Sequence, residues 1–198
     1  MTLSNFYIGE TEVTQELWEE VMGSNPSLFT PNGSKKRPVE SVSWDDCQEF
    51  IRRLNQLTGK NFRLPTEAEW EFAARGGIKS RHTKYSGGAS LDAVAWCFEN
   101  AYDIGKSSPD YGSHPVAKKA PNELGLYDMS GNVWEWCYDW YGDYTPSSQS
   151  NSKGPSQGFY RVTRGGSWNC NARNCRVSRR YGGSPVFRTI YVGLRLAL

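Results

Sequence analysis

The sequence has no long apolar run, few histidines and no closely spaced cysteine pair. No apolar run approaches the ~20 residues that a membrane helix needs, so we expect no membrane span in this chain. Only two His are present and the five Cys form no Cys-x-x-Cys pair, which argues against structural zinc. The net charge of +2 lacks the basic excess of a nucleic-acid-binding surface, so we expect no nucleic-acid partner.

No leader peptide is visible at the start of the chain. The residues that follow Met1 are polar and run directly into an aromatic segment at Phe6 and Tyr7. Two locations therefore stay open: the cytosol, or a compartment reached through a leader that this sequence lacks. The odd number of cysteines does not decide between a reducing and an oxidising compartment.

Aromatic residues carry much of the apolar content. Only 37% of the 198 residues are hydrophobic, yet 14% are aromatic and eight are Trp. A core of this composition has to be built from large rings held by turns and loops. The length suits one domain, which we expect to span residues 1–198. The Trp residues expected in its core are Trp18, Trp44, Trp70, Trp134, Trp136 and Trp168.

Helix signals are confined to the first eighty residues. Thr14 is expected to cap a helix that starts at Gln15 and ends before Gly23. A capping-box-like start at Ser43 predicts a second helix that ends before Gly59. The T-x-x-E box at Thr66 predicts a third, which ends at residues 76–77.

The rest of the chain is predicted to form loops and short strands. Residues 76–125 are rich in Gly, Ser, Pro, Asn and Asp, which is typical of a long, internally packed loop. Strand-like runs follow at residues 133–138, 160–163, 167–169 and 190–198. Because the helices come first and the strands later, we expect an α+β fold rather than an alternating one.

Several long motifs stand in order along the chain. They are EVT at 12–14, VSW at 42–44, FRLPTEAEWEFAARGG at 62–77, PNELGLYDMSGNVWEW at 121–136, RGGSW at 164–168 and VGLR at 192–195. Together they closely resemble the formylglycine-generating enzyme (sulfatase-modifying factor) family, and the match spans the chain. The resemblance implies a C-type-lectin-like α+β fold with little regular secondary structure, in agreement with the predicted elements.

The resemblance brings an enzymatic alternative. Enzymes of this family bind copper(I) through two cysteines near the C-terminus and oxidise a substrate cysteine to formylglycine; soft thiolates suit copper(I). Cys170 and Cys175 stand at comparable positions, so the alternative function is a copper-dependent oxidase. However, residues 174–179 resemble a later Arg-rich strand of the family, which aligns Cys175 with a buried structural position. In an extended segment, Cys170 and Cys175 would point to opposite faces, which would leave Cys170 as a surface thiol.

The end of the chain has a composition of its own. Residues 169–198 contain no Lys, Glu, Gln or Trp, although the preceding chain uses them freely. Framework residues, which keep a fixed pattern, are 164–168, Ala172, 175–178, Pro185, Arg188 and 192–195. The residues between them, here called the candidate variable positions, are Asn169, Cys170, Asn171, Arg173, Asn174, Arg179, Tyr181, Gly182, Gly183, Ser184, Val186, Phe187, Thr189, Ile190 and Tyr191.

The candidate variable positions follow one codon rule. Each of their residue types can be reached from an Asn codon by changing its adenines and keeping the final pyrimidine. The types that this rule cannot produce (Lys, Met, Gln, Glu and Trp) are absent from the set. This pattern resembles the variable proteins of diversity-generating retroelements, in which adenine-directed mutagenesis diversifies the C-terminal segment of such a lectin-like domain. Asn169, Asn171 and Asn174 would be positions left at the template residue.

A diversified segment implies an exposed binding surface. Its mixture of Tyr, Phe, Ser, Gly, Asn and Arg is typical of adaptable paratopes, and Tyr181, Phe187, Ile190 and Tyr191 would form an exposed apolar patch. We therefore expect a monomeric receptor-like protein, rather than an enzyme, that binds a protein or small-molecule ligand through residues 169–191 without a required cofactor. By resemblance, it is a cell-surface lipoprotein with a lipid anchor upstream. The alternative is that residues 169–198 are ordinary β core.

The arginines of this segment divide into two groups. Framework Arg176, Arg188 and Arg195 are expected to hold backbone carbonyls or acidic side chains. Arg173, Arg179 and Arg180 are expected to be free to contact an anionic ligand.

Four residues match positions that bind calcium in the family's enzymes. They are Asp128 and Glu135, through their side chains, and Gly131 and Val133, through their carbonyls. Hard oxygen donors on a turn suit calcium, so the resemblance implies a structural calcium ion. The alternative is that Glu135 makes a buried hydrogen bond or ion pair near the Trp residues.

The codon rule generates a prediction about the neighbouring DNA. We expect a near-copy of the codons for residues 164–195, with AAC or AAT at the candidate variable positions, next to a gene for a reverse transcriptase. Sequencing of the flanking DNA checks it. A locus with neither feature would contradict the resemblance to a retroelement variable protein.

Overall fold

One mixed four-stranded sheet forms the centre of the fold. The computed structural model describes residues 1–30 and 35–198, and its strands are β1 (Trp134–Trp140), β2 (Arg161–Arg164), β3 (Arg180–Gly183) and β4 (Val192–Leu194). Their order is β3-β2-β1-β4. β1 pairs antiparallel with β2 and parallel with β4, and β2 pairs antiparallel with β3. β3 and β4 are therefore the edge strands of this sheet.

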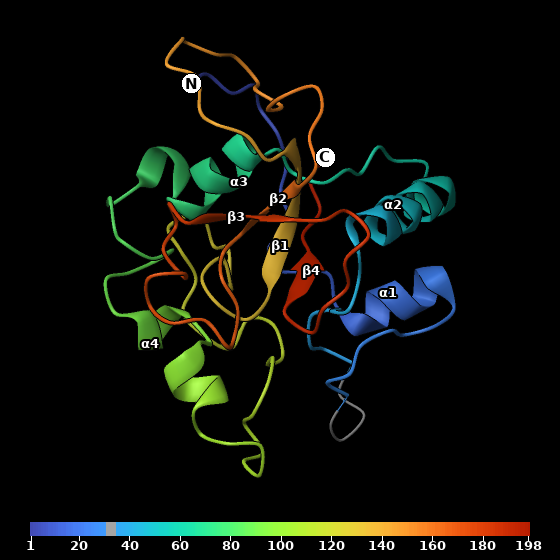
Figure 1. The fold of residues 1–198 in the computed structure, drawn as a ribbon, viewed down its shortest axis with the longest axis vertical. Helices are drawn as coiled ribbons and strands as arrows, with labels where there is room; N and C mark the ends of the chain where they lie inside the picture. The colour runs from blue at the N-terminus through green and yellow to red at the C-terminus, as the bar shows by residue number, and fades with distance from the viewer. Residues whose placement is uncertain (31–34) are drawn as a thin grey trace.

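Helices cover the sheet from two sides. α1 (Gln15–Met22) and α2 (Trp44–Thr58) lie on one side and α3 (Glu67–Ala74) on the other (Figure 1). Thr14, Ser43 and Thr66 cap the three N-termini with their side chains, as expected for Ser and Thr at this position. The three predicted helices are confirmed, and the α+β class with them.

Other parts of the secondary-structure prediction are wrong. Short helices follow the first eighty residues, at α4 (Leu91–Val94) and at the π-helical turn η3 (Phe98–Tyr102), and a 3₁₀ turn, η2, covers Gly77–Lys79. Residues 167–169 form a turn instead of a strand, because Gly165 and Gly166 before them take φ values of +96° and +80°. Strand β3 was missed because glycine, which occupies half of it, disfavours strands.

The side chains of β1 alternate between two apolar clusters. Trp136 packs with Trp18 and Phe50 on the side of α1 and α2, whereas Cys137 packs with Trp70 under α3. The sheet is therefore a layer between two helical layers. The Trp residues predicted to form the core divide into two groups: Trp18, Trp70, Trp136 and Trp168 are buried, and Trp44 and Trp134 are half-buried against it.

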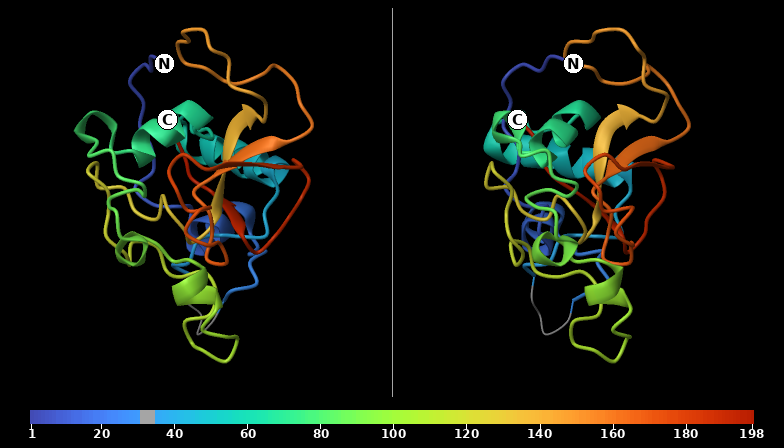
Figure 2. Two further views of the ribbon diagram at one scale, coloured as in Figure 1. Left: turned by 60° about the vertical axis from the view of Figure 1, so that its left-hand side comes forward. Right: turned by 90° about the vertical axis from the view of Figure 1, so that its left-hand side faces the viewer.

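The two ends of the chain lie close together, beside the projecting loop at residues 142–157 (Figure 2). Tyr7 and Leu198 exchange two backbone hydrogen bonds, each of 3.0 Å, and the N–H of Thr2 donates to the carbonyl of Gln149 at 2.9 Å. Within residues 1–30 and 35–198, the helices are all too short or too polar to cross a bilayer.

A buried carboxyl joins β1 to the start of α3. Asp139 is 3% exposed, and its Oδ2 accepts a hydrogen bond from the backbone N–H of Glu67 at 2.8 Å. Burial raises the pKa of Asp139 to about 6, with a further rise from the charge of Glu67. Because the folded state holds this proton more tightly than the unfolded state, the carboxyl stabilises the fold below its unfolded pKa. That contribution is lost as the pH rises through about 6.

We expect Asp139→Asn to remove this pH dependence. The amide oxygen still accepts the hydrogen bond from Glu67 but carries no buried charge. The free energy of unfolding of the variant minus that of the parent should increase by on the order of 2 kcal/mol from about pH 4 to about pH 8. Urea unfolding at the two pH values measures it, with the exposed Asp143→Asn as the matched control. A difference between variant and parent that does not change with pH would contradict the prediction.

Candidate functional site

The candidate variable positions and the framework residues differ in burial. None of the fifteen candidate variable positions is buried; each is exposed or half-buried. Framework residues 164–168 and 192–195 are buried throughout, as are Cys175 and Val177. Framework residues Arg176, Ser178 and Arg188 are exposed. The segment therefore alternates between anchors in the core and positions that are accessible to solvent.

Two turns, not an extended segment, connect the core motif to β3. The N–H of Asn174 donates to the carbonyl of Asn171 at 2.9 Å, and the N–H of Arg179 donates to that of Arg176 at 2.9 Å. The prediction of a strand at residues 174–179 is therefore wrong. The prediction that Cys170 and Cys175 point to opposite faces, which assumed extension, fails for the same reason.

The turns bring two cysteines into one apolar cluster. Cys175 is buried, Cys170 is half-buried, and both pack with Cys97, Tyr85 and Val94. The thiol of Cys175 lies 3.7 Å from the carbonyl oxygen of Cys170. Burial raises the pKa of Cys175 well above its usual value, with smaller contributions from Cys170 and Cys97. Cys175 is thus a buried thiol, as expected, whereas Cys170 is less exposed than a surface thiol.

The loop after β3 is fastened to the N-terminus of α2. The N–H of Asp45 donates to the carbonyl of Pro185 at 3.3 Å, and Arg188 forms an ion pair with Asp46 at 2.6 Å. The N–H of Ser41 donates to the carbonyl of Thr189 at 3.0 Å. These contacts hold the loop backbone while Val186 and Phe187, between them, stay 65% and 58% exposed.

Aromatic residues from outside the segment extend the surface. Tyr191 is half-buried against Trp168, with ring centroids 5.1 Å apart, so it is not fully exposed as predicted; Ile190 is also half-buried. Tyr102 and Tyr111 pack on the same Trp168 ring, at 5.6 and 5.1 Å. These two tyrosines could not be assigned to the site from the sequence, because they are distant in sequence from Trp168 and join it only through tertiary packing.

The arginines behave only partly as predicted. Arg188 and Arg195 hold acidic side chains, as expected, but Arg176 is exposed and forms no ion pair with any described residue. Arg180, predicted to be free, pairs with Glu67 at 2.6 Å. Arg173 and Arg179 are exposed, and neither has an ion pair within residues 1–30 and 35–198. The exposed arginines of the segment that form no ion pair with a described residue are therefore Arg173, Arg176 and Arg179.

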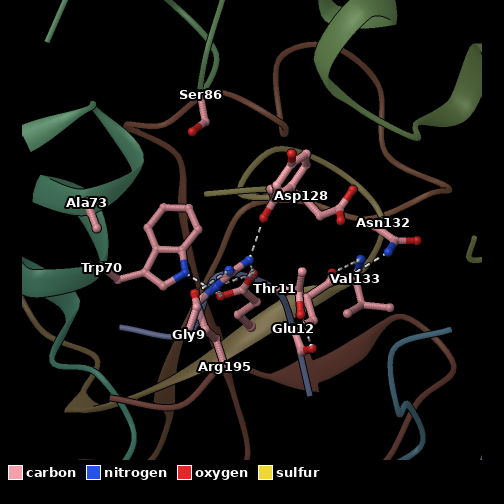
Figure 3. Close-up of polar contacts among 12 residues, drawn as sticks. Gly9, Thr11, Glu12, Trp70, Ala73, Ser86, Asp128, Asn132, Val133 and Arg195 are labelled. Atoms are coloured by element: carbon pink, nitrogen blue, oxygen red, sulfur yellow. Dashed lines mark hydrogen bonds and ion pairs between the residues drawn. The ribbon is translucent and has the colours of Figure 1, made fainter. Parts of the chain in front are cut away.

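Glu135, one of the predicted calcium residues, forms a buried ion pair with Arg195. Figure 3 shows Arg195 in one region with Trp70, Asp128 and Val133. Both oxygens of Glu135 accept hydrogen bonds from Arg195, at 2.7 to 3.2 Å, and Oε2 also accepts one from the indole of Trp70 at 2.6 Å. Gly131 turns the chain with φ of +81°, and the N–H of Val133 donates to Glu12 at 3.1 Å. The guanidinium of Arg195 thus already neutralises Glu135.

The two carboxylate oxygens of Asp128 differ in their contacts. Its Oδ2 accepts from the N–H of Ala117 at 2.8 Å, but its Oδ1, also buried, has no hydrogen-bond partner among the described residues. Burial raises the pKa of Asp128 to about 6. No cluster of three His, Cys, Asp or Glu side chains in the described part of the chain is arranged to hold a metal. A calcium ion at this site stays a prediction. Glu135 would bind it only through oxygens that also accept hydrogen bonds from Arg195.

A separate cleft lies beside the chain ends. It has a volume of about 1330 Å³ and lies between the N-terminal segment, α3 and the loop at residues 142–155. Glu67, Glu71 and Arg180 line it, and none of the candidate variable positions does. The surface formed by the candidate variable positions is therefore distinct from this cleft.

These features define the class of the protein. The family model of the sulfatase-modifying factor enzyme 1-like domain matches residues 1–198, and the chain belongs to this family. The fold is the C-type-lectin-like fold of the formylglycine-generating-enzyme type.

Three particular relatives show what the chain is similar to. It is 35% identical to the chaperone protein LppX of Paenibacillus barcinonensis, over 90% of this chain and 74% of that protein. It is 36% identical to the formylglycine-generating enzyme of Thermomonospora curvata, over 91% of this chain but only 60% of the enzyme. The solved structure of Treponema denticola variable protein 1 superposes with a TM-score of 0.88 and 39% identity, covering 98% of this chain and 84% of that one.

The contacts of Glu135 generate a prediction about metal removal. Because Arg195 neutralises Glu135, we expect millimolar EGTA to change the melting temperature by less than ~1 °C. The variant Glu135→Gln should lose roughly 3–5 kcal/mol of unfolding free energy, because it removes the carboxylate that forms the ion pair with buried Arg195. Calorimetry with and without EGTA measures the first effect and urea unfolding the second. A parent protein that EGTA destabilises as much as Glu135→Gln does would show that calcium holds this site.

Proposed function

We propose that this chain is a ligand-binding, receptor-like protein of the diversity-generating retroelement type, with the candidate variable positions as its binding surface. The observation that carries the proposal is the division by burial: every candidate variable position is accessible, and the core motifs that flank them are buried. A core segment with an accidental composition would bury some of these positions.

The chemistry of the accessible side chains supports the same function. Tyr181, Val186 and Phe187 are each 58 to 65% exposed, so their side chains are available to contact a ligand. Arg173 and Arg179 add exposed positive charge. Rigid rings supply contact area at low entropic cost, and arginine supplies directional hydrogen bonds.

The similarity to Treponema denticola variable protein 1, at 39% identity over nearly the whole chain, also supports this proposal. By the same analogy we propose display at the cell surface through a lipid anchor upstream. The ligand would be a protein or a small molecule, bound by a monomer without a required cofactor.

The alternative is a copper-dependent oxidase that uses Cys170 and Cys175. Its support is the 36% identity to a formylglycine-generating enzyme and the proximity of the two cysteines in one cluster. The residues fit copper(I) only in part, because two thiolates are required and burial raises the pKa of Cys175. Bound copper would supply the oxygen chemistry, and this chain would contribute the two sulfur ligands.

A copper(I) assay separates the two functions. We expect no tight binding of copper(I) in competition with a chelator, and no formylglycine in a cysteine-containing sulfatase peptide incubated with the protein and copper. Mass spectrometry of the peptide measures the second. Cys170→Ser should behave like the parent in both assays, with Cys47→Ser, a change outside the pair, as the control. Product formation that is lost only in Cys170→Ser would establish the oxidase.

A further inference from the structure

Strand β3 is an edge strand made largely of candidate variable positions. It pairs with β2 through Arg180, Tyr181, Gly182 and Gly183, and no strand of the described residues pairs with its other side. In an antiparallel pair, every second residue directs its N–H and C=O away from the partner strand. Apart from the pairing with β2, the backbone of these four residues makes no hydrogen bond to any other described residue.

The outer side of β3 is open to solvent at the backbone itself. Gly182 and Gly183 are both partly exposed, and glycine has no side chain, so the exposed surface is main chain. At Gly183 a Cβ would lie 2.5 Å from the ring of Trp136, and at Gly182 it would lie 3.1 Å from the ring of Tyr141. Two consecutive residues thus present a bare peptide edge, which is a ready template for another strand.

The side chains at the two ends of β3 differ in chemistry. The exposed cations Arg176 and Arg179 precede the strand. Between them, the N–H of Val177 donates to the carbonyl of Lys84, which is also exposed. None of these three cations forms an ion pair within the described residues. Beyond the strand, Val186 and Phe187 are exposed and apolar. A partner that runs along the edge would therefore meet positive charge at one end and apolar side chains at the other.

We propose that β3 binds an extended acidic peptide segment of a partner protein, which adds to the sheet as a fifth strand. Main-chain hydrogen bonds to the edge supply part of the affinity. Carboxylates of the segment pair with Arg176 and Arg179, and its apolar residues contact Tyr181 and Phe187. This inference rests on the proposed function and names the class of its ligand.

Selection from a displayed library of random ten-residue peptides on the immobilised protein tests the proposal. We expect enrichment of peptides with several Asp or Glu and with β-branched or aromatic residues at alternate positions. One selected peptide is then synthesised, together with a series in which each amide nitrogen in turn is methylated. Methylation at every second position should weaken binding about tenfold, and at the positions between them much less.

Charge reversal tests the basic end of the strand. Arg179→Glu should weaken binding of the selected peptide at least about tenfold, since it replaces an attraction by a repulsion. The Arg179 side chain makes no hydrogen bond or ion pair among the described residues, so the variant should keep the melting temperature of the parent. Lys60→Glu, beyond the C-terminus of α2, makes the same change in net charge and should bind like the parent.

The outcomes separate this inference from the proposed function. Peptides that lose binding in Arg179→Glu but tolerate methylation at every position would overturn strand addition and leave a binding surface in place. Absence of any enriched peptide would overturn the peptide class, while the copper assay and the neighbouring DNA still test the function. A dimer in analytical ultracentrifugation, together with the absence of any enriched peptide, would overturn the proposal in favour of a second copy of the chain on this edge.

Discussion

The ion pair between Glu135 and Arg195 is the interaction on which the rest of the structure depends. Both residues are fully buried, so each charge needs the other. Glu135 also accepts from Trp70 of α3, and Arg195 donates to the carbonyls of Gly9 and Tyr127. One buried charge pair therefore joins β1, the residue that follows β4, α3, the N-terminal segment and the long central loop. Because the fold has few regular elements, this ion pair makes contacts between segments that longer helices and strands make in other folds.

The candidate variable positions and part of the fixed core lie together in the last thirty residues of the chain. Two short blocks of buried anchors, residues 164–168 and 192–195, belong to strands or turns packed on β1, and Cys175 and Val177 are buried between them. Between the blocks the chain is held by the ion pairs of Arg180 and Arg188 and by backbone contacts: the turns at residues 171–179 and the hydrogen bonds from Ser41 and Asp45. Backbone contacts do not depend on side-chain identity, so they are compatible with a segment whose side chains differ.

Much of the fold could be predicted from the sequence, because its signals are local. The caps of the three long helices lie within four residues of the positions that they fix, and the motif around Glu135 has the alternation of a strand. Strand β3 could not be predicted, because its two glycines are placed by Trp136 and Tyr141, which are distant in sequence. The same limit applies at the candidate site. Its positions follow from the codon rule, but Tyr102 and Tyr111 join it only through tertiary packing on Trp168.

The contact between Gly183 and Trp136 has a consequence for relatives of this protein. Any residue other than glycine at 183 needs space that the buried indole now fills, so either the ring or the strand has to move. The ring is held by the hydrogen bond from its Nε1 to the carbonyl of Val42, which leaves the edge strand as the easier part to shift. Relatives that differ at this position would then differ in the path of their main chain. A repertoire built on this scaffold would vary in shape as well as in surface chemistry.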